Sequence, residues 1–369
     1  MDRRHFVRSG LLAGSALGSA ALVGCGMVPL RPAQATPGPG ASAATDGTLR
    51  KIALGSCTDE SKPQPIWNAV LADRPDLVIF GGDNVYSSAQ PWSLAALEQA
   101  YEAQAAVQPF ARLRQAVRHL AIWDDHDYGL NDGGVEFPHK QASKEAFLRF
   151  WKVPQTDPRQ GREGIYHAET YGPPGRRVQV ILLDTRWFKS AWRPTDQRNA
   201  PGKERYLPDF TTGKTILGEA QWQWLAAQLR QPADVRLIVS GIQVIADGHG
   251  WERWGLFPLE LHRLYRLITV SNANGVVFLS GDRHIGAFYR ETRAAPYPLY
   301  ELTSSGITHP WRDAKEAGPN RLGELFTELH YGTVEIDWEA RRLHLHLKDL
   351  AGVARRSQTV DLNQLRVNA

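Results

Sequence analysis

The sequence predicts an α/β fold in which two sheets pack as a sandwich with helices on its flanks. Short apolar runs typical of buried strands alternate with helical segments, and the later part of the chain is richer in strands. No internal repeat or second linker interrupts residues 49–369, which we therefore expect to form one domain. With 369 residues and twelve Trp, the chain can bury a sizeable, aromatic-rich core.

The first half of this domain supplies apolar runs, KIALGS and DLVIFGGD among them, separated by segments with helical spacing. An Ala/Leu/Gln/Glu-rich stretch after the second run predicts a long helix. The expected elements are a strand at 51–56, a helix at 65–72, a strand at 76–83, one helical stretch at 91–117, a strand at 119–127 that ends in a charged loop, and a helix at 144–151.

The second half continues the alternation and ends in a hairpin. A Pro-Pro-Gly turn joins two alternating strands, and a Glu-Ala-Arg turn joins the last two. On the final strand, His344 and His346 are expected on a surface face. The expected elements are strands at 166–172 and 176–185, a helix at 219–231, a strand at 235–241, a helix at 259–269, strands at 276–282 and 287–292, and a hairpin over 332–350.

Residues 1–25 have the features of an export signal. Arg3 and Arg4 precede an apolar stretch from Leu11 to Val23, which at about 13 residues is shorter than the ~20 needed to span a bilayer. This pattern resembles a twin-arginine signal, which implies export of the folded protein by the twin-arginine translocase.

The end of the signal resembles a bacterial lipoprotein box, Leu22-Val23-Gly24-Cys25, and a Pro/Gly/Ala/Ser-rich tether follows at 26–48. We expect Cys25 to carry a lipid anchor that holds the protein to a membrane, in the periplasm or cell envelope. Simple cleavage is the alternative. Because the only other cysteine, Cys57, has a different expected role, no disulfide is expected.

Charge argues against one class of function. The formal net charge is +4, and the leader contributes two of these charges. A nucleic-acid-binding protein should show a concentrated basic face, so we exclude that class.

Chemically active residues follow the ends of four apolar strands. Ligands gather beyond the carboxyl ends of strands in open α/β sheets, so we expect one crevice to collect these side chains. They are Cys57, Asp83, Tyr86, Asp125, His126, Asp282 and His284. Crowded carboxylates repel one another unless cations neutralise them, and this mixture of ligand types predicts a multinuclear metal site.

Six motifs in chain order resemble the alkaline phosphatase D family of metallophosphatases, within the calcineurin-like phosphoesterase superfamily. They are GSC, GGDNVY, WDDHDYGLND, LLDTR, HGWERWGLFP and LSGDRH, and they lie between residues 55 and 284. The resemblance implies a calcineurin-like metallophosphatase sandwich and an enzyme that hydrolyses phosphate esters.

The resemblance also implies a set of metal ligands. Cys57 and Tyr86 would bind an iron, Asp83 would bridge two metals, Asp125 would bind the second metal, and Asp282 and His284 would both be ligands. Thiolate plus phenolate suits Fe³⁺ and the Asp-rich remainder suits Ca²⁺, with Zn²⁺ or Mn²⁺ as alternatives. Gln243 stands where the superfamily has a further His ligand, so one coordination position stays open.

Three residues carry implied catalytic roles. His126 corresponds to a phosphate-facing group or general acid, and Asp127 to the residue that orients it. Arg186 in LLDTR is expected either to clamp two phosphate oxygens with its guanidinium or to form an ion pair with a nearby acid.

We therefore expect an exported metal-dependent phosphoesterase that hydrolyses phosphate mono- or diesters with a metal-bound hydroxide. The alternatives are a phospholipase-type phosphodiesterase and a non-catalytic surface lipoprotein on the same fold. A Trp/Arg rim near Trp251 would suit a larger substrate.

Overall fold

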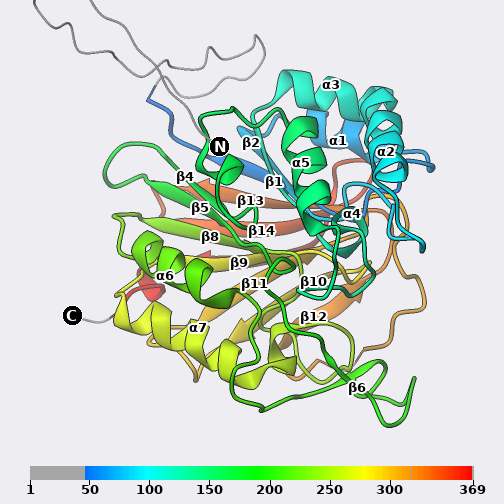
Figure 1. Ribbon diagram of the computed structural model, residues 1–369. Helices are drawn as coiled ribbons and strands as arrows, with labels where there is room; N and C mark the ends of the chain where they lie inside the picture. Colours follow the sequence, from blue (N-terminus) through cyan, green and yellow to red (C-terminus); the bar gives the residue numbers. More distant parts are fainter. Residues whose placement is uncertain (1–45, 317, 368–369) are drawn as a thin grey trace, which may run out of the picture. The chain divides into compact units, whose positions relative to one another are not determined.

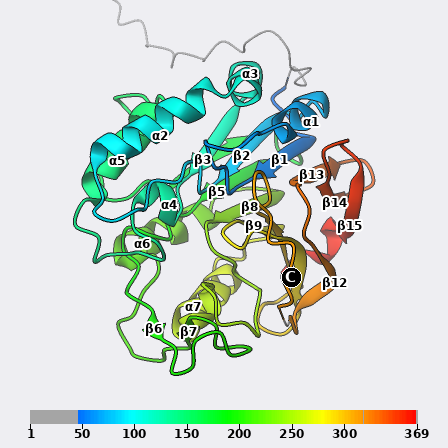
Figure 2. The same ribbon diagram turned by 90° about the vertical axis from the view of Figure 1, so that its right-hand side faces the viewer.

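The computed structural model describes residues 46–316 and 318–367, so the leader, Cys25 and most of the tether lie outside the described residues. Two mixed sheets lie face to face with helices on their outer sides (Figure 1; Figure 2). The sandwich with flanking helices predicted from the sequence is confirmed.

The first sheet joins the start of the described chain to its end. Its strand order is β15 (Ala354–Asp361), β14 (Arg342–Lys348), β13 (Tyr331–Asp337), β1 (Lys51–Gly55), β2 (Leu77–Gly81) and β3 (His119–Ile122). Strands β1, β2 and β3 run parallel, and every residue of β2 is buried. Burial on both faces explains why the apolar run of β2 is continuous rather than alternating.

The second sheet is formed by the middle of the chain. Its order is β12 (Arg321–Phe326), β10 (Gly286–Glu291), β11 (Leu299–Ser304), β9 (Val276–Ser280), β8 (Val235–Ser240), β5 (Val178–Leu182) and β4 (His167–Tyr171). The four strands β11, β9, β8 and β5 are parallel to one another. A separate hairpin pairs β6 (Arg193–Pro194) with β7 (Tyr206–Leu207).

The two sheets touch closely where β1 meets β11. The Ser56 hydroxyl donates to the Ser304 carbonyl at 3.2 Å, and the Ser304 hydroxyl donates to the Leu54 carbonyl at 3.4 Å. A Cβ added to Gly332 of β13 would lie 3.0 Å from the Cβ of Ser304, so glycine allows the close approach. These contacts bring the carboxyl ends of the parallel strands of both sheets to one edge of the sandwich.

Helices cover the outer face of each sheet. On the first sheet lie α1 (Ile66–Ala72), α2 (Leu94–Ala106), α3 (Gln108–Ala116) and α5 (Lys140–Phe150), and on the second lie α6 (Gly218–Leu229) and α7 (Pro258–Val270) (Figure 1). Trp67 of α1 packs edge-on against Phe80 of β2, with ring centroids 5.4 Å apart. Trp67, Trp123, Trp222 and Trp254 are essentially fully buried, which confirms the aromatic-rich core.

The helical stretch at 91–117 is two helices rather than one. Val107 between α2 and α3 is extended, with ψ of 110°, and Pro109 occupies the first turn of α3. Proline in a continuous helix would remove a hydrogen bond and clash with the preceding turn, so the chain breaks there.

Other predicted boundaries and elements also differ. The charged loop after β3 contains a single helical turn, α4 (Asp125–Tyr128), and α5 begins four residues before the predicted 144. Strands β11, β12 and β15 and the β6–β7 hairpin were not among the predicted elements. Short 3-10 turns lie at Pro158–Gln160, Trp254–Leu256 and Leu362–Gln364.

No helix within the described ranges has both the length and the apolar character needed to cross a membrane.

Candidate metal centre

Three strand ends place four functional side chains on strained backbone. Cys57 follows β1, Asp83 follows β2, and Asp282 and His284 follow β9. All four have left-handed backbone, with φ of 61°, 49°, 64° and 55°. Non-glycine residues seldom adopt this conformation because it raises the free energy of the backbone. It is found mainly at functional sites, where the surrounding structure holds the side chain in position. These turns bring residues from both sheets to one crevice, as predicted.

Cys57, Asp83, Tyr86 and His284 form the first group. The thiol of Cys57 lies 3.5 Å from Oδ2 of Asp83, and the hydroxyl of Tyr86 lies 3.4 Å from the same oxygen. The Tyr86 hydroxyl is also 3.2 Å from Nε2 of His284. A thiol, a phenol, a carboxylate and an imidazole therefore share one small volume. Three of them, those of Cys57, Asp83 and His284, have ligand atoms within 4.8 Å of one another.

Asp125 connects the further groups. It belongs to three sets of residues, and within each set the ligand atoms lie within 4.8 Å of one another. One of these sets also contains Asp83, which is a member of the group with Cys57 and His284. The sets are Asp83–Asp125–His126, Asp124–Asp125–Asp282 and Asp125–Asp132–Glu252. Two ligand groups that share a carboxylate can hold neighbouring cations with that carboxylate between them.

The ionised forms of Asp83 and Asp282 are electrostatically unfavourable without cations. Burial raises the pKa of Asp83 well above its ordinary value, and the charges of Asp125 and Asp124 raise it further. Burial and then the charges of Glu252 and Asp124 do the same to the pKa of Asp282. Bound cations would reverse these effects, because an opposite charge nearby favours the ionised form.

Burial shifts the pKa of the Cys57 thiol and the pKa of the His284 imidazole in opposite directions. Burial, followed by the charges of Asp83 and Asp282, raises the pKa of the Cys57 thiol well above its ordinary value. Burial, followed by His309 and Arg283, lowers the pKa of His284 to about 3. His284 is thus a neutral imidazole at neutral pH, which is the form that binds a metal.

Two buried carboxylate oxygens of the cluster lack hydrogen-bond partners in the described part of the chain. They are Oδ1 of Asp125 and Oδ2 of Asp124. Buried polar atoms normally have a partner, and leaving a charged one unpaired is costly. These two oxygens therefore fit hard cations, for which carboxylates are the preferred ligands.

Arg186 adopts the ion-pair arrangement, the second of its two expected alternatives. Its guanidinium is completely buried, with Nε 2.6 Å from Oδ1 of Asp124. Both terminal nitrogens donate to Glu252 at 2.8 Å. A clamp on phosphate is not supported, because these donors are already committed to two carboxylates. Asp184 of the same motif accepts a hydrogen bond from the Trp123 indole at 2.9 Å, so its role is to position a buried core residue.

His126 lies against the first group, but its ring partner is not the predicted one. Its ring centroid is 4.1 Å from that of Tyr86, and its Nδ1 is 2.7 Å from the Ser88 hydroxyl. Asp127 instead accepts from the Asp124 amide at 2.7 Å and from the Asn84 side chain at 2.5 Å. Asp127 thus completes the capping box of α4 and fixes the loop that carries His126, and no hydrogen bond joins its carboxylate to the His126 ring.

Gln243 is committed to a buried hydrogen-bond network. Its amide nitrogen donates to Tyr289 and Thr303, both at 3.1 Å, and its carbonyl oxygen lies 3.1 Å from Nε2 of His249. This buried network gives His249 a structural role. Carboxylates from other elements, Asp124 and Glu252 among them, belong to the candidate metal groups.

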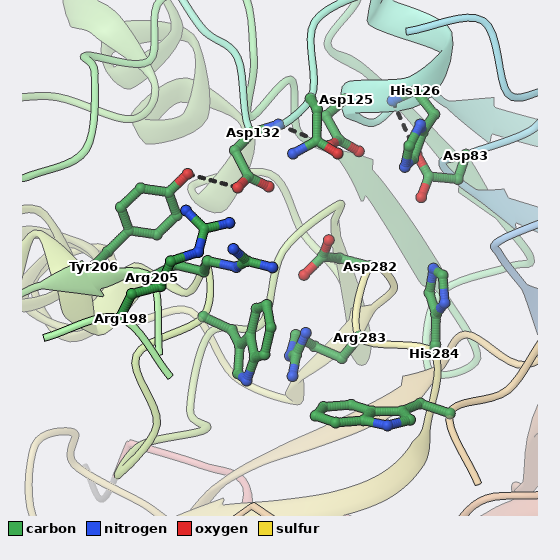
Figure 3. A pocket seen from close by; sticks show the side chains of 13 residues that line it. Asp83, Asp125, His126, Asp132, Arg198, Arg205, Tyr206, Asp282, Arg283 and His284 are labelled. Carbon is green, nitrogen blue, oxygen red and sulfur yellow. Dashed lines mark hydrogen bonds between the residues drawn. The ribbon is translucent and has the colours of Figure 1, made fainter. Parts of the chain in front are cut away.

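A cavity of about 570 Å³ opens over the cluster (Figure 3). Its lining includes several residues to which the sequence analysis gave no role: Asn131, Asp132, Arg198, Arg205, Tyr206, Arg283 and Trp311. His309 was also missed, although its ring centroid lies 4.3 Å from that of His284. Asp132 had a detectable signal, because it ends the same WDDHDYGLND motif as Asp125.

Known proteins resemble this chain in sequence and in fold. The PhoD-like phosphatase family matches residues 52–332. Alkaline phosphatase D from Bacillus subtilis (strain 168) is 26% identical over 190 residues, which cover 45% of this chain and 30% of the relative's length.

Two solved structures share the fold. A structure of PhoD superposes with a TM-score of 0.64 at 17% identity, covering 90% of this chain and 72% of that chain. Purple acid phosphatase PPD1 from yellow lupin (Lupinus luteus) gives a TM-score of 0.54 at 10% identity, covering 88% of this chain and 55% of that chain. The predicted metallophosphatase sandwich is therefore confirmed.

Proposed function

The chain belongs to the PhoD-like phosphatase family, and on that premise we propose that it is a metal-dependent hydrolase of phosphate esters. One observation carries the proposal: Asp83 is shared between a group containing Cys57 and His284 and a group containing Asp125 and His126. A shared carboxylate supports a site with at least two adjacent cations. Such sites stabilise the attacking and leaving oxygens of an in-line displacement at phosphorus.

The donor types favour particular metals at the two groups. The Cys57 thiolate and the Tyr86 phenolate suit Fe³⁺, whereas Asp125 and Asp282 suit Ca²⁺, with Zn²⁺ or Mn²⁺ as alternatives. When bound, these cations would supply charge neutralisation for the phosphate and activation of water.

The chain's own residues would then position the reactants. Asp83 accepts the His126 backbone N–H at 3.2 Å, which keeps that loop against the cluster. With Nδ1 held by Ser88, the ring of His126 can carry a proton on Nε2 and donate it to the leaving oxygen. Arg186 holds Asp124 and Glu252 in place through ion pairs. Its positive charge opposes the effect of burial on both, and the pKa of Glu252 stays below its ordinary value, whereas burial still raises the pKa of Asp124 to about 7.

Both mono- and diesters are proposed as substrates. The cavity extends past the metal groups to Arg198 and Trp251, which leaves room for a leaving group larger than a simple alcohol. A phosphodiesterase of the phospholipase type is therefore the alternative within the same chemistry.

Hydrolysis of p-nitrophenyl phosphate and of bis(p-nitrophenyl) phosphate tests the proposal. The purified protein should lose activity on chelation and regain it when Ca²⁺ and Fe³⁺ are restored, and the faster substrate decides between phosphatase and diesterase. No turnover of either ester by protein shown to hold metal would contradict the proposal and favour a non-catalytic surface lipoprotein.

We also propose that the protein is exported by the twin-arginine translocase and anchored by a lipid on Cys25 in the periplasm or cell envelope. The support is the sequence pattern of residues 1–25 and the tether that follows. In a bacterial host fed labelled palmitate, the full chain should be labelled and Cys25→Ser should not. Equal labelling of both would contradict the anchor, and export unchanged in Arg3→Lys/Arg4→Lys would contradict the route.

A further inference from the structure

We propose that Arg198, Arg205 and Arg283 form a subsite for a second anionic group of the substrate. The inference rests on the proposed hydrolase function and adds a substrate class to it. That class is phosphate esters that carry a further phosphate or a carboxylate beyond the scissile phosphate.

The cavity has two chemically different sides (Figure 3). Asp83, His126 and His284 lie on one side, and Arg198 and Arg205 lie on the other, with Asp282 between them. The two arginines come from the segment that connects β6 to β7, far in sequence from the strand ends that hold the cluster. A phosphate held at the cluster would therefore direct the rest of the ester toward these guanidinium groups.

Trp251 holds two of the guanidinium groups in place. Cζ of Arg205 lies 5.0 Å from its ring centroid, and Cζ of Arg283 lies 4.8 Å from the same centroid. Trp311 packs edge-on against Trp251, with centroids 5.7 Å apart, and lies 5.9 Å from Arg283. Cation–π contacts of this kind fix a guanidinium plane while leaving its N–H groups available to an anion.

The arginines keep donors available. Within residues 46–316 and 318–367, neither Arg198 nor Arg205 forms an ion pair, although acidic residues flank both in the sequence. Those acids are committed elsewhere: Asp196 pairs with Lys203 at 3.1 Å, and Glu204 accepts the Gly202 amide at 3.0 Å.

Arg283 adds a buried donor to the same wall. It is 7% exposed and pairs with Glu316, which does not line the cavity, while its Nε has no hydrogen-bond partner in the described part of the chain. An unsatisfied buried N–H of a charged group is costly and is best explained by a ligand or water that completes it.

A simpler role would be to neutralise the acidic cluster. That role requires close ion pairs, yet none of the three guanidinium groups lies within 4.0 Å of a cavity carboxylate among the described residues. Bound cations would neutralise the carboxylates of the cluster in any case. The three guanidinium groups are therefore available to bind the substrate. Guanidinium forks match phosphate and carboxylate oxygens, so the group they bind is anionic.

Two matched pairs of esters test the subsite with the full-length, metal-loaded protein. Phenyl phosphate is compared with 4-carboxyphenyl phosphate, and glucose 6-phosphate with glucose 1,6-bisphosphate. The ratio of kcat/KM for the anionic ester over its partner is measured in wild type and in Arg198→Met/Arg205→Met. Differences in intrinsic reactivity cancel when these ratios are compared between proteins.

The double variant should lower the ratio about tenfold or more for at least one pair, with kcat/KM for the neutral leaving groups changed less than about threefold. Added salt should weaken the wild-type preference. The pair that responds identifies carboxylate or phosphate as the preferred anion. Arg266→Met, an exposed arginine on α7, is the control and should leave both ratios unchanged.

Equal losses for both members of each pair, or no change at all, would overturn the subsite while leaving the hydrolase proposal intact. If wild type holding metal hydrolyses neither these four esters nor bis(p-nitrophenyl) phosphate, both proposals fail. Turnover of that diester alone would overturn the subsite and leave the hydrolase proposal intact. A thermal melt of each variant separates loss of the subsite from loss of folding, and Arg205→Lys should retain part of the preference because it keeps the charge.

Discussion

The Tyr86 hydroxyl lies 3.2 Å from Nε2 of His284, although 198 residues separate them in the chain. Tyr86 follows a strand of the first sheet and His284 follows a strand of the second. The contact therefore exists only when the two sheets pack with their carboxyl ends at one edge. The candidate metal centre is a product of the sandwich, because neither sheet alone holds all of its ligands.

Replacing Tyr86 with Phe tests the assignment of this phenol to the iron group. We expect Tyr86→Phe to retain less iron after dialysis, with hydrolysis reduced about tenfold or more, because a hard anionic ligand is lost. Calcium content should stay near that of wild type. Iron and calcium measured by mass spectrometry check the prediction, and unchanged iron retention would contradict it.

His126→Asn should reveal a proton donor through the leaving group. If His126 donates to the leaving oxygen, the variant should lose about 10²-fold or more in kcat for an alkyl phosphate and much less for p-nitrophenyl phosphate. The good leaving group needs no proton, so its rate is the internal control. Equal losses for both esters would point to a role in binding or metal ligation instead.

Arg186→Met should destabilise the fold as well as the site. It leaves the buried Asp124 carboxylate without its cation and Glu252 with only Lys189, 3.8 Å away. Removing one partner of a buried pair costs about 3–5 kcal/mol. Urea unfolding measures the loss. Arg50→Met is the matched control, because the Arg50–Glu339 pair is exposed and should contribute about 0–1 kcal/mol. Similar losses in both variants would contradict this account.

Asp73 should make stability depend on pH away from the metal centre. It accepts from Lys51 and Lys348, both at 2.7 Å. Burial raises the pKa of Asp73, but the bonds and charges of the two lysines outweigh it and leave the pKa below its ordinary 3.8. The unfolded chain therefore takes up the proton first as pH falls, so the contribution is full above pH 3.8 and lost below it.

Asp73→Asn should thus be about 1–2 kcal/mol less stable than wild type at pH 7, with the difference shrinking toward pH 3. Urea unfolding at both pH values checks it. Asp313→Asn, at an exposed position, is the control and should show no such change. A difference between Asp73→Asn and wild type that persists undiminished at pH 3 would contradict the assignment.

Sequence patterns predicted the fold class and most elements because the buried parallel strands are continuous apolar runs bounded by turn residues. They missed β12 and β15, which carry half-exposed or exposed residues and so lack that signal. The break at Val107 was visible only in the position of Pro109 within an otherwise helical stretch. Short-range patterns thus identified most of the core and missed the exposed edge strands, although they also missed β11, a fully buried interior strand.

The candidate site shows the same division. Residues at strand ends, such as Cys57 and Asp83, were predictable because strand order alone places them together. Glu252 and Arg205 come from long connections, and only the folded chain shows that they reach the cavity or its acids. The two partners of Arg186, Asp124 and Glu252, could not be predicted from the sequence either. A buried guanidinium can pair with a carboxylate from any neighbouring element.

The central claim is that shared carboxylates hold the metals that perform hydrolysis, and Asp83→Asn tests it most directly. Metal content and p-nitrophenyl phosphate hydrolysis should be measured on the same samples of wild type and variant. We predict that Asp83→Asn loses bound metal and loses activity by at least about 10³-fold, while its melting temperature shows that it still folds. A folded variant that hydrolyses the ester at a rate near wild type would contradict the account.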